Sequence, residues 1–214
     1  MENPTKEEIL KELFNHFNQD IADIHEKGER NKEIYNSFKY DTTLGNRGSF
    51  TKDEEEYIFI ESEEIAEGIA IDQVKEDLED DPTMFTQTWL QDFIYISDTD
   101  KRMICNDEED SIREQVRDEK LDEEESPEKE EEIDKIVETR VKEYEISLKD
   151  PIEYFVNEQG VYSVEDLMKQ SWINIKIDEA AKDAVRTDGW AHFLSRYDGE
   201  YETTQNGIVY FKDC

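Results

Sequence analysis

The imbalance of charge constrains this chain most, because like charges repel one another whenever a chain becomes compact. Its 214 residues carry 59 Asp and Glu against 25 Lys and Arg, a formal net charge of −34 at pH 7. Self-repulsion of this size destabilises a folded state. A small soluble domain needs a net charge of only about 2–8 in magnitude. The surplus therefore favours a protein that uses its negative surface.

The chain nevertheless has the apolar side chains that folding requires. Leu, Ile, Val and Phe together number 49, just above the level of roughly one fifth below which disorder is expected. There are 23 aromatic residues, and the apolar residues recur in periodic groups. We therefore expect a folded protein with at least one disordered or purely solvated stretch.

The charge is concentrated in the middle of the chain. Residues 51–100 hold 17 acids and 2 bases (−15), and residues 101–150 hold 20 and 10 (−10), so together they supply −25 of the −34. Acids alternate with apolar residues in 51–100 and run almost unbroken in 106–132. We predict an N-terminal amphipathic helical region (1–50), an acidic folded core region (51–105), a highly charged helical region (106–146) and a C-terminal helix-hairpin region (147–214).

Local patterns at the start of the chain predict helices. Thr5 with Glu8 is typical of a capping box. Apolar residues then recur at steps of three and four, which predicts one helix ending near Gly28. A second helix is expected over 29–40. The Gly and Asn content of 44–49 predicts a loop.

The acidic region that follows predicts a mixture of elements. Residues 56–60 suit a strand or the lead-in to a helix. Ser62 predicts the cap of the next helix, which Pro82 ends. Residues 84–96 are the most apolar group in the chain and predict a core helix, with a strand as the alternative at 93–96.

The highly charged region predicts two helices. One is expected over 111–125 and carries few apolar residues, so we expect it to be weakly anchored. The other is expected over 127–146 and carries an apolar stripe. Ser126-Pro127 is a typical start for it, because Pro is tolerated in the first turn of a helix.

The C-terminal region predicts short helices and a hairpin. Helices are expected at 152–156, after Ser163 and at 177–185, with an extended segment at 172–177. Asn206-Gly207, between 199–204 and 208–212, is a strong hairpin signal. The fold class predicted is α+β, mostly α, with helices and a short C-terminal β-hairpin.

The sequence offers little catalytic or metal-binding chemistry. His16, His25 and His192 stand apart, and two cysteines, Cys105 and Cys214, cannot complete the roughly four ligands of a zinc site. The acids at 98–100 and 107–110 lack the calcium-loop pattern, which favours solvated charge. No nucleophile elbow, phosphate loop or dinucleotide fingerprint is present. We expect no metal, no cofactor and no enzyme. An enzyme would need a pocket, for which the ordinary composition of 150–214 is the best place.

Location and partners are constrained by the same features. Residues 1–11 show no secretory signal, no stretch approaches the roughly 20 apolar residues of a membrane span, and two cysteines make no disulfide framework. We expect a protein of a reducing cytoplasm. Repulsion argues against direct binding to nucleic acid or to anionic lipid. The oligomeric state stays open, a homodimer included.

The acidic surface itself is the best candidate site. Carboxylates on helices can be spaced like successive phosphates, so a rigid array could occupy a channel lined by Lys and Arg. We place it first in 53–81, which suits a rigid region, and second in 107–132. The predicted partner-binding residues are Asp53, Glu54, Glu55, Glu56, Glu61, Glu63, Glu64, Glu67, Glu76, Asp77, Glu79, Asp80 and Asp81, then Asp107, Glu108, Glu109, Asp110, Asp122, Glu123, Glu124 and Glu125.

Two resemblances point the same way. In size and charge the chain resembles the acidic DNA-mimic inhibitors of bacteriophages and mobile elements, of the anti-restriction or anti-CRISPR type. Asp188-Gly-Trp-Ala-His-Phe-Leu-Ser-Arg-Tyr-Asp-Gly-Glu200, with 208–212, is similar to a C-terminal segment of uncharacterised phage proteins. The first resemblance implies an inhibitor of a basic nucleic-acid-binding host protein, such as a defence nuclease, a CRISPR effector or a transcription enzyme, in the bacterial cytoplasm. The second implies a phage origin and a helix-turn-hairpin.

The same electrostatics leave two other functions open. An immunity or chaperone-like protein that neutralises a basic partner would share the charge without needing the spacing of phosphates. An enzyme of unknown class is the third hypothesis. Competition by nucleic acid separates the first two, because only a mimic shares its binding site with DNA or RNA.

Overall fold

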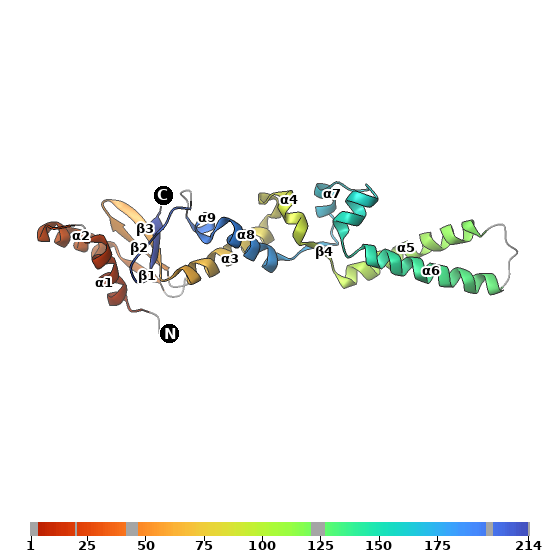
Figure 1. Ribbon diagram of the computed structural model, residues 1–214, viewed down its shortest axis with the longest axis horizontal. Helices are drawn as coiled ribbons and strands as arrows, with labels where there is room; N and C mark the ends of the chain where they lie inside the picture. Colours follow the sequence, from red (N-terminus) through yellow and green to blue (C-terminus); the bar gives the residue numbers. More distant parts are fainter. Residues whose placement is uncertain (1–3, 20, 42–46, 121–126, 196–198, 214) are drawn as a thin grey trace. The chain divides into compact units, whose positions relative to one another are not determined.

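The computed structural model describes residues 4–19, 21–41, 47–120, 127–195 and 199–213. The chain divides into two compact units (Figure 1). Unit 1 comprises residues 1–82 and 181–214, and unit 2 comprises residues 83–180. Unit 1 is therefore assembled from two segments that are far apart in the sequence. Among the described residues, no helix combines the length and apolar character needed to cross a membrane.

A five-stranded antiparallel sheet forms the centre of unit 1. Its order is β1 (Lys39–Asp41), β2 (Arg47–Lys52), β3 (Glu55–Ile60), β7 (Val209–Lys212) and β6 (Glu202–Thr203). Of the two alternatives for 56–60, the strand is the correct one. The C-terminal hairpin is confirmed, with Gly207 at φ +92° in the turn.

Strand β2 corrects the sequence prediction for this region. The loop predicted over 44–49 is wrong at 47–49, which pair with β1 and β3; residues 44–46 lie outside the described residues. Gly48 is required in this strand, because a Cβ would collide with the Phe59 ring and the Lys39 carbonyl. The glycine that suggested a loop thus marks a close approach between strands.

Helices α1 (Lys6–Phe17) and α2 (Ile24–Ser37) form the first hydrophobic core with this sheet. The predicted capping box at Thr5 and Glu8 is confirmed. The single helix predicted to end near Gly28 is wrong. The side chain of Asn18 donates to the carbonyl of Phe14 (2.7 Å) at the end of α1, and a new helix begins at Ile24.

Helix α2 replaces the helix predicted over 29–40. It begins earlier, because Asp23 caps it, and it ends at Ser37. The residues that follow extend as β1 instead of continuing the helix. Ile24, expected on the buried stripe of the first helix, is 86% exposed.

The remaining helices of unit 1 include α3 (Glu63–Asp80), which Ser62 caps and which ends just before Pro82, as predicted. Helix α8 (Ile177–Asp188) leads to α9 (Trp190–Leu194), and α3 packs against α9. Apolar side chains of strands β3 and β7 are also buried: Ile58, Ile60, Val209 and Phe211.

Unit 2 begins with short turns rather than with the predicted core helix. Residues 84–96 hold the end of η2 (Pro82–Met84), then α4 (Gln87–Leu90), η3 (Gln91–Phe93) and β4 (Ile94–Ile96). The strand alternative is therefore the correct one at 94–96. Ile94 and Ile96 are buried while Tyr95 is 37% exposed. Buried and exposed side chains therefore alternate here, as in a strand and not as in a helix. Strand β4 pairs with β5 (Ile173–Ile175).

A helical hairpin makes up most of the rest of unit 2. Helix α5 (Asp98–Glu119) begins at Asp98 rather than at the predicted residue 111, because Ser97 caps it. It packs against α6 (Pro127–Ser147), and η4 (Ile152–Glu158) and α7 (Val164–Met168) follow.

The hairpin is anchored through a small apolar cluster. Ile112 and Val116 of α5 are buried against Ile133 and Val137 of α6. Residues 106–119 are helical, as expected of the highly charged helical region.

Candidate functional site

Helix α3 carries the largest part of the predicted acidic site, and its sequence decides which side faces the protein. Ser62 accepts a hydrogen bond from the backbone N–H of Ile65 (3.3 Å) at its N-terminus. Residues four apart lie on one side of a helix. Buried residues recur in this way along α3: Ala66, Ala70, Val74 and Leu78. The other sides of α3 are therefore left to solvent.

Those sides carry far more acids than bases. The 18 residues of α3 include eight acids and one base, Lys75, which pairs with Asp72 at 3.7 Å. Seven acids are exposed: Glu63, Glu64, Glu67, Asp72, Glu76, Glu79 and Asp80. Among the described residues, no Lys or Arg lies within ion-pair distance of five of them: Glu64, Glu67, Glu76, Glu79 and Asp80. Their charge is therefore presented outward.

The other predicted residues near α3 have protein partners. Asp77 is half-buried and accepts a hydrogen bond from Gln73 (3.0 Å). The backbone N–H of Asp81 donates to the carbonyl of Asp77 (2.9 Å). The half-buried Glu61 accepts a hydrogen bond from the Tyr40 hydroxyl. Burial, and then this carboxylate, raise the pKa of Tyr40.

The acids at 53–56 lie in the turn between β2 and β3 and at the start of β3. Asp53 pairs with Arg30 (3.3 Å) and Lys52 (3.2 Å). Partial burial acts to raise the pKa of Asp53, but these two bases outweigh it and lower that pKa. Glu55 pairs with Lys212 at 2.5 Å, and this contact lowers the pKa of Glu55. Glu54 and Glu56 are exposed. Bases thus neutralise half of this group.

The second predicted group lies on α5, in the other unit. Asp107 and Asp110 are exposed, Glu108 is half-buried, and Glu109 pairs with Arg113 at 3.3 Å. The rest of the predicted group, Asp122, Glu123, Glu124 and Glu125, lies outside the described residues. The two predicted groups belong to different units, so they are two surfaces to be tested separately.

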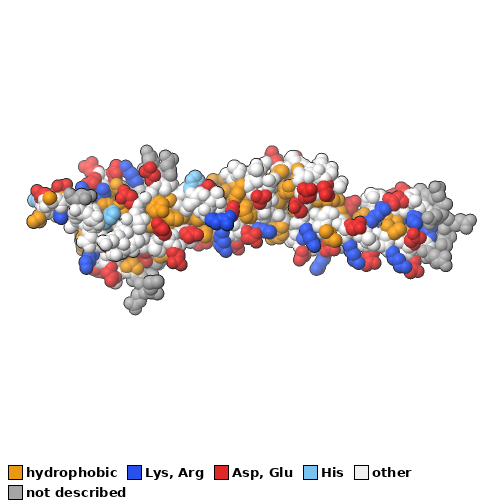
Figure 2. Space-filling model, viewed as in Figure 1, with side chains coloured by type: hydrophobic (Ala, Val, Ile, Leu, Met, Phe, Trp, Pro, Cys, Tyr) orange, Lys and Arg blue, Asp and Glu red, His pale blue; other side chains and the backbone are white. Residues whose placement is uncertain are grey.

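Ion pairs between α5 and α6 take up much of the remaining charge of the hairpin. The pairs that join α6 to α5 and to Lys120, which follows α5, are Arg113 with Asp134 (2.5 Å), Arg117 with Glu130 (2.8 Å), Lys120 with Glu132 (2.7 Å) and Arg140 with Glu119 (2.6 Å). Figure 2 shows blue and red side chains intermixed over the hairpin. The hairpin therefore presents mixed charge.

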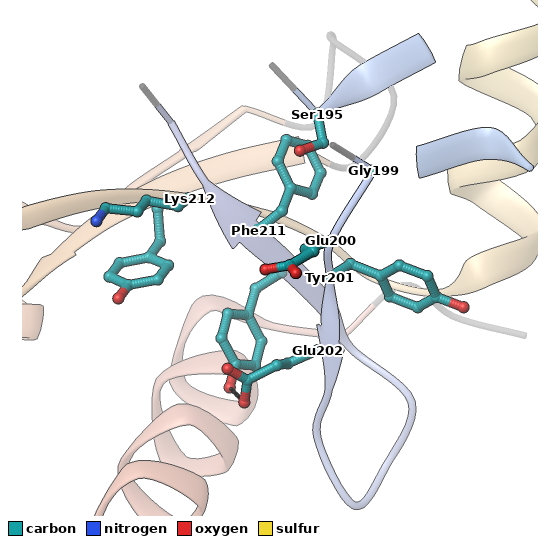
Figure 3. Close-up of a pocket in the computed structure, with 9 residues that line it drawn as sticks. Ser195, Gly199, Glu200, Tyr201, Glu202, Phe211 and Lys212 are labelled. Carbon is teal, nitrogen blue, oxygen red and sulfur yellow. Dashed lines mark hydrogen bonds between the residues drawn. The ribbon is translucent and has the colours of Figure 1, made fainter. Parts of the chain in front are cut away.

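Sequence reasoning missed one acid of the α3 surface, and for a pocket it named only the range 150–214, without lining residues. Asp72 lies one helical turn before Glu76, a spacing that could have identified it. A pocket of about 620 Å³ lies beside the C-terminal hairpin, where Figure 3 shows Glu200, Glu202 and Lys212. This pocket depends on contacts between distant segments, which no local pattern in the sequence indicates.

A chain of hydrogen bonds fixes one wall of this pocket. The Tyr210 hydroxyl donates to Glu202 (2.5 Å), so it accepts from Nε2 of His16 (2.8 Å). Burial, and then Glu202, raise the pKa of Tyr210. Burial, and then Glu55, raise the pKa of Tyr57 to about 12. These tyrosines therefore act as neutral hydrogen-bond donors that orient carboxylates.

Two further findings complete the description. Among the described residues, no three His, Cys, Asp or Glu side chains are grouped closely enough to hold a metal ion. No protein-family model, curated protein or solved structure matches the chain.

Proposed function

We propose that this chain is a stoichiometric inhibitor that presents α3 as a mimic of nucleic-acid charge to the basic nucleic-acid-binding site of a host defence or transcription enzyme. The observation that carries the proposal is the set of five exposed acids on α3 beside which the described residues place no base. An inhibitor of this kind works in the bacterial cytoplasm, needs no cofactor and avoids nucleic acid itself, which it repels.

The density of charge on α3 supports mimicry. Eight acids and one base give its 18 residues a net charge of −7. At about 1.5 Å per residue the helix is about 27 Å long, which makes about one net negative charge per 4 Å. One strand of B-DNA carries one phosphate per about 3.4 Å. A channel that binds a nucleic-acid strand would therefore meet a similar amount of negative charge per unit length.

The anchoring of α3 also supports the proposal. The helix packs against α9 and β3 and buries one row of its side chains, so the acids stand on a helix that is already folded. A disordered acidic run loses backbone conformational entropy when it binds, whereas the backbone of a folded helix is already ordered. Long-range attraction would speed association with a basic target, and added salt would weaken it.

A matched pair of variants tests the site. The first replaces Glu67, Glu76, Glu79 and Asp80 by Lys. The last three lie in the C-terminal part of α3, where lysines agree with the helix dipole. Glu67 lies in its N-terminal half and is exposed, so the fold should hold. The control replaces Glu29, Glu143, Glu145 and Glu158 by Lys, four exposed acids outside both predicted acidic surfaces. Both variants contain four acid-to-base reversals and so change the net charge equally. Each is used to capture proteins from a bacterial lysate at about 0.15 M salt, with and without excess DNA.

If α3 mimics nucleic acid, the original chain and the control should retain a nucleic-acid enzyme that excess DNA displaces, and the α3 variant should lose it. Equal capture by both variants would remove α3 as the site. A basic partner that ignores DNA would replace mimicry with the neutralising function of an immunity or chaperone-like protein.

A further inference from the structure

A groove of about 590 Å³ lies between α1 and α2 in unit 1. Lys11, Asn15 and Asn18 line it from the side of α1, at steps of four and three residues. Lys27, Asn31 and Tyr35 line it from α2, at steps of four. Residues at these steps share one face of a helix, so each side of the groove carries one row of side chains.

The groove also has an apolar component. Leu10 is 4% exposed and Phe14 is half-buried, and both line the groove. Tyr35 is 58% exposed although it is a large aromatic residue. Exposed aromatic rings beside polar groups are a common feature of binding surfaces. The groove therefore combines an apolar surface with two polar rows.

Hydrogen-bond donors are in excess along these rows. Asn18 Nδ2 donates to the Phe14 carbonyl and to Asn31 Oδ1, both at 2.7 Å. This contact uses the oxygen of Asn31 and leaves the two N–H donors of its amide. Among the described residues, no hydrogen bond takes up these donors, and no carboxylate lies within ion-pair distance of Lys11 or Lys27. In the part of the chain that the structure describes, Asn18 Oδ1 is buried without a partner, so this amide pair is incompletely satisfied there.

The charge of the groove is opposite to that of the chain. Among the described residues of the lining, Lys11 and Lys27 stand against one acid, Glu7, whereas acids outnumber bases by 34 in the sequence. The carboxamides of Asn15 and Asn31 line the groove together with these two ammonium groups. Ammonium and amide N–H groups bind carboxylate and carbonyl oxygens.

We infer that this groove binds an extended peptide segment of a partner protein, with a carboxylate of the peptide held between Lys11 and Lys27. The amide of Asn31 donates to a backbone carbonyl of the peptide, and an apolar side chain of the peptide packs on Leu10 and Phe14. This site is separate from α3 and does not depend on the proposed inhibition. A strongly acidic protein would thereby have a second binding surface, which prefers a negatively charged ligand.

The test uses the full chain and two probes. One probe is an acetylated pentapeptide amide with aspartate between two leucines, and the other has asparagine in place of the aspartate. Binding is followed by NMR through the side-chain amides of Asn15 and Asn31, at about 0.15 M salt to limit repulsion by the rest of the chain. The test variant is Lys11→Gln with Lys27→Gln. Lys32→Gln is the matched control, an exposed lysine of α2 outside the groove lining.

We expect the aspartate peptide to shift both amides in a saturable way. The asparagine peptide and the double variant should each weaken binding roughly tenfold, as expected for loss of a charge-assisted contact, whereas Lys32→Gln should leave it within about twofold. Absence of a saturable shift, equal affinity for both peptides, or an unchanged double variant with intact amide spectra would overturn the inference. Because no target enzyme takes part, this result is independent of the test on α3.

Discussion

Helix α3 and the α5–α6 hairpin are both rich in acids, yet they use them in opposite ways. On α3, eight acids accompany one base. On α5 and α6 together, 17 acids accompany eight bases, and inter-helix pairs form at 2.5–2.8 Å. The number of acids alone does not decide what a surface offers. The position of the bases decides whether charge is neutralised inside the protein or presented to a partner.

The two regions also differ in how they are held in place. Helix α3 buries one row of side chains and packs against other elements of unit 1. Within its described residues the hairpin has a seam of four buried side chains, with Ile136 and Val141 partly buried beside it. Exposed ion pairs contribute little individually, whereas burial of an aliphatic side chain contributes about 1.5–3 kcal/mol. We therefore expect the short seam, rather than the ion pairs, to dominate the stability of the hairpin.

The largest effect should come from breaking that seam. Ile133 is 3% exposed, and Ile133→Ala should lower the free energy of unfolding of the hairpin by roughly 2–4 kcal/mol, through lost burial and a residual cavity. Hydrogen exchange in α5 and α6 should accelerate while that of α3 stays unchanged. Ile146→Ala is the control, because Ile146 lies on the same helix and is 61% exposed. If both variants behave alike, the ion pairs hold the hairpin.

The second-largest difference between α3 and the α5–α6 hairpin should appear when the pH is lowered. A hydrogen bond from Arg140 lowers the pKa of Glu119, and one from Lys120 lowers the pKa of Glu132. A lowered pKa stabilises the fold above the unfolded value and loses that contribution as pH falls through the folded value. Between about pH 5 and pH 3, α5 and α6 should therefore lose exchange protection, after correction for intrinsic rates. On α3, protonation removes repulsion, so its protection should hold.

The variant Arg140→Gln serves as the control for this acid effect. It has already lost the pair with Glu119, so its hairpin should start less protected and change less on acidification. A loss of protection that is the same in both proteins would mean that this pair contributes nothing measurable to the hairpin.

Local signals in the sequence predicted much of the fold, because they depend on neighbours along the chain. The caps at Thr5 and Ser62 and the turn at Asn206-Gly207 are of this kind. Long-range pairing was not predictable. Strand β7 pairs with β3 although the two are far apart in the sequence, and the partner of each base on α5 is decided by how α6 packs against it.

The break between α1 and α2 shows how one wrong helix prediction prevents a groove from being predicted. Apolar spacing from Ile9 to Ile24 predicted one straight helix, and the competing signal was the capping chemistry of Asn18 and Asp23. Only the break brings the row that begins at Lys11 opposite the row that begins at Lys27. By contrast, most of the acids of α3 were identified from sequence, since helical spacing and composition suffice for a surface on one helix.

The smallest effect should come from a single charge reversal on each region. Glu79→Lys removes an acid that has no described base beside it and places a cation in the last turn of α3, where it agrees with the helix dipole. We expect it to stabilise α3 by about 0.3–1 kcal/mol. Asp134→Lys makes the same change of charge on the hairpin but removes the partner of Arg113, so it should destabilise α5 and α6 slightly.

Hydrogen exchange of the two variants at low and high salt measures both effects, and because each concerns exposed charges, salt should reduce both. If the placement of bases decides how the acids act, Glu79→Lys and Asp134→Lys must change stability in opposite directions. If both reversals stabilise the protein alike, relief of the overall negative charge outweighs the local placement of bases, and the contrast between α3 and the hairpin has no energetic basis. If both reversals destabilise the protein, the acids of α3 contribute to its stability. Glu79 in particular is then held by a contact within the protein and is not offered to a partner.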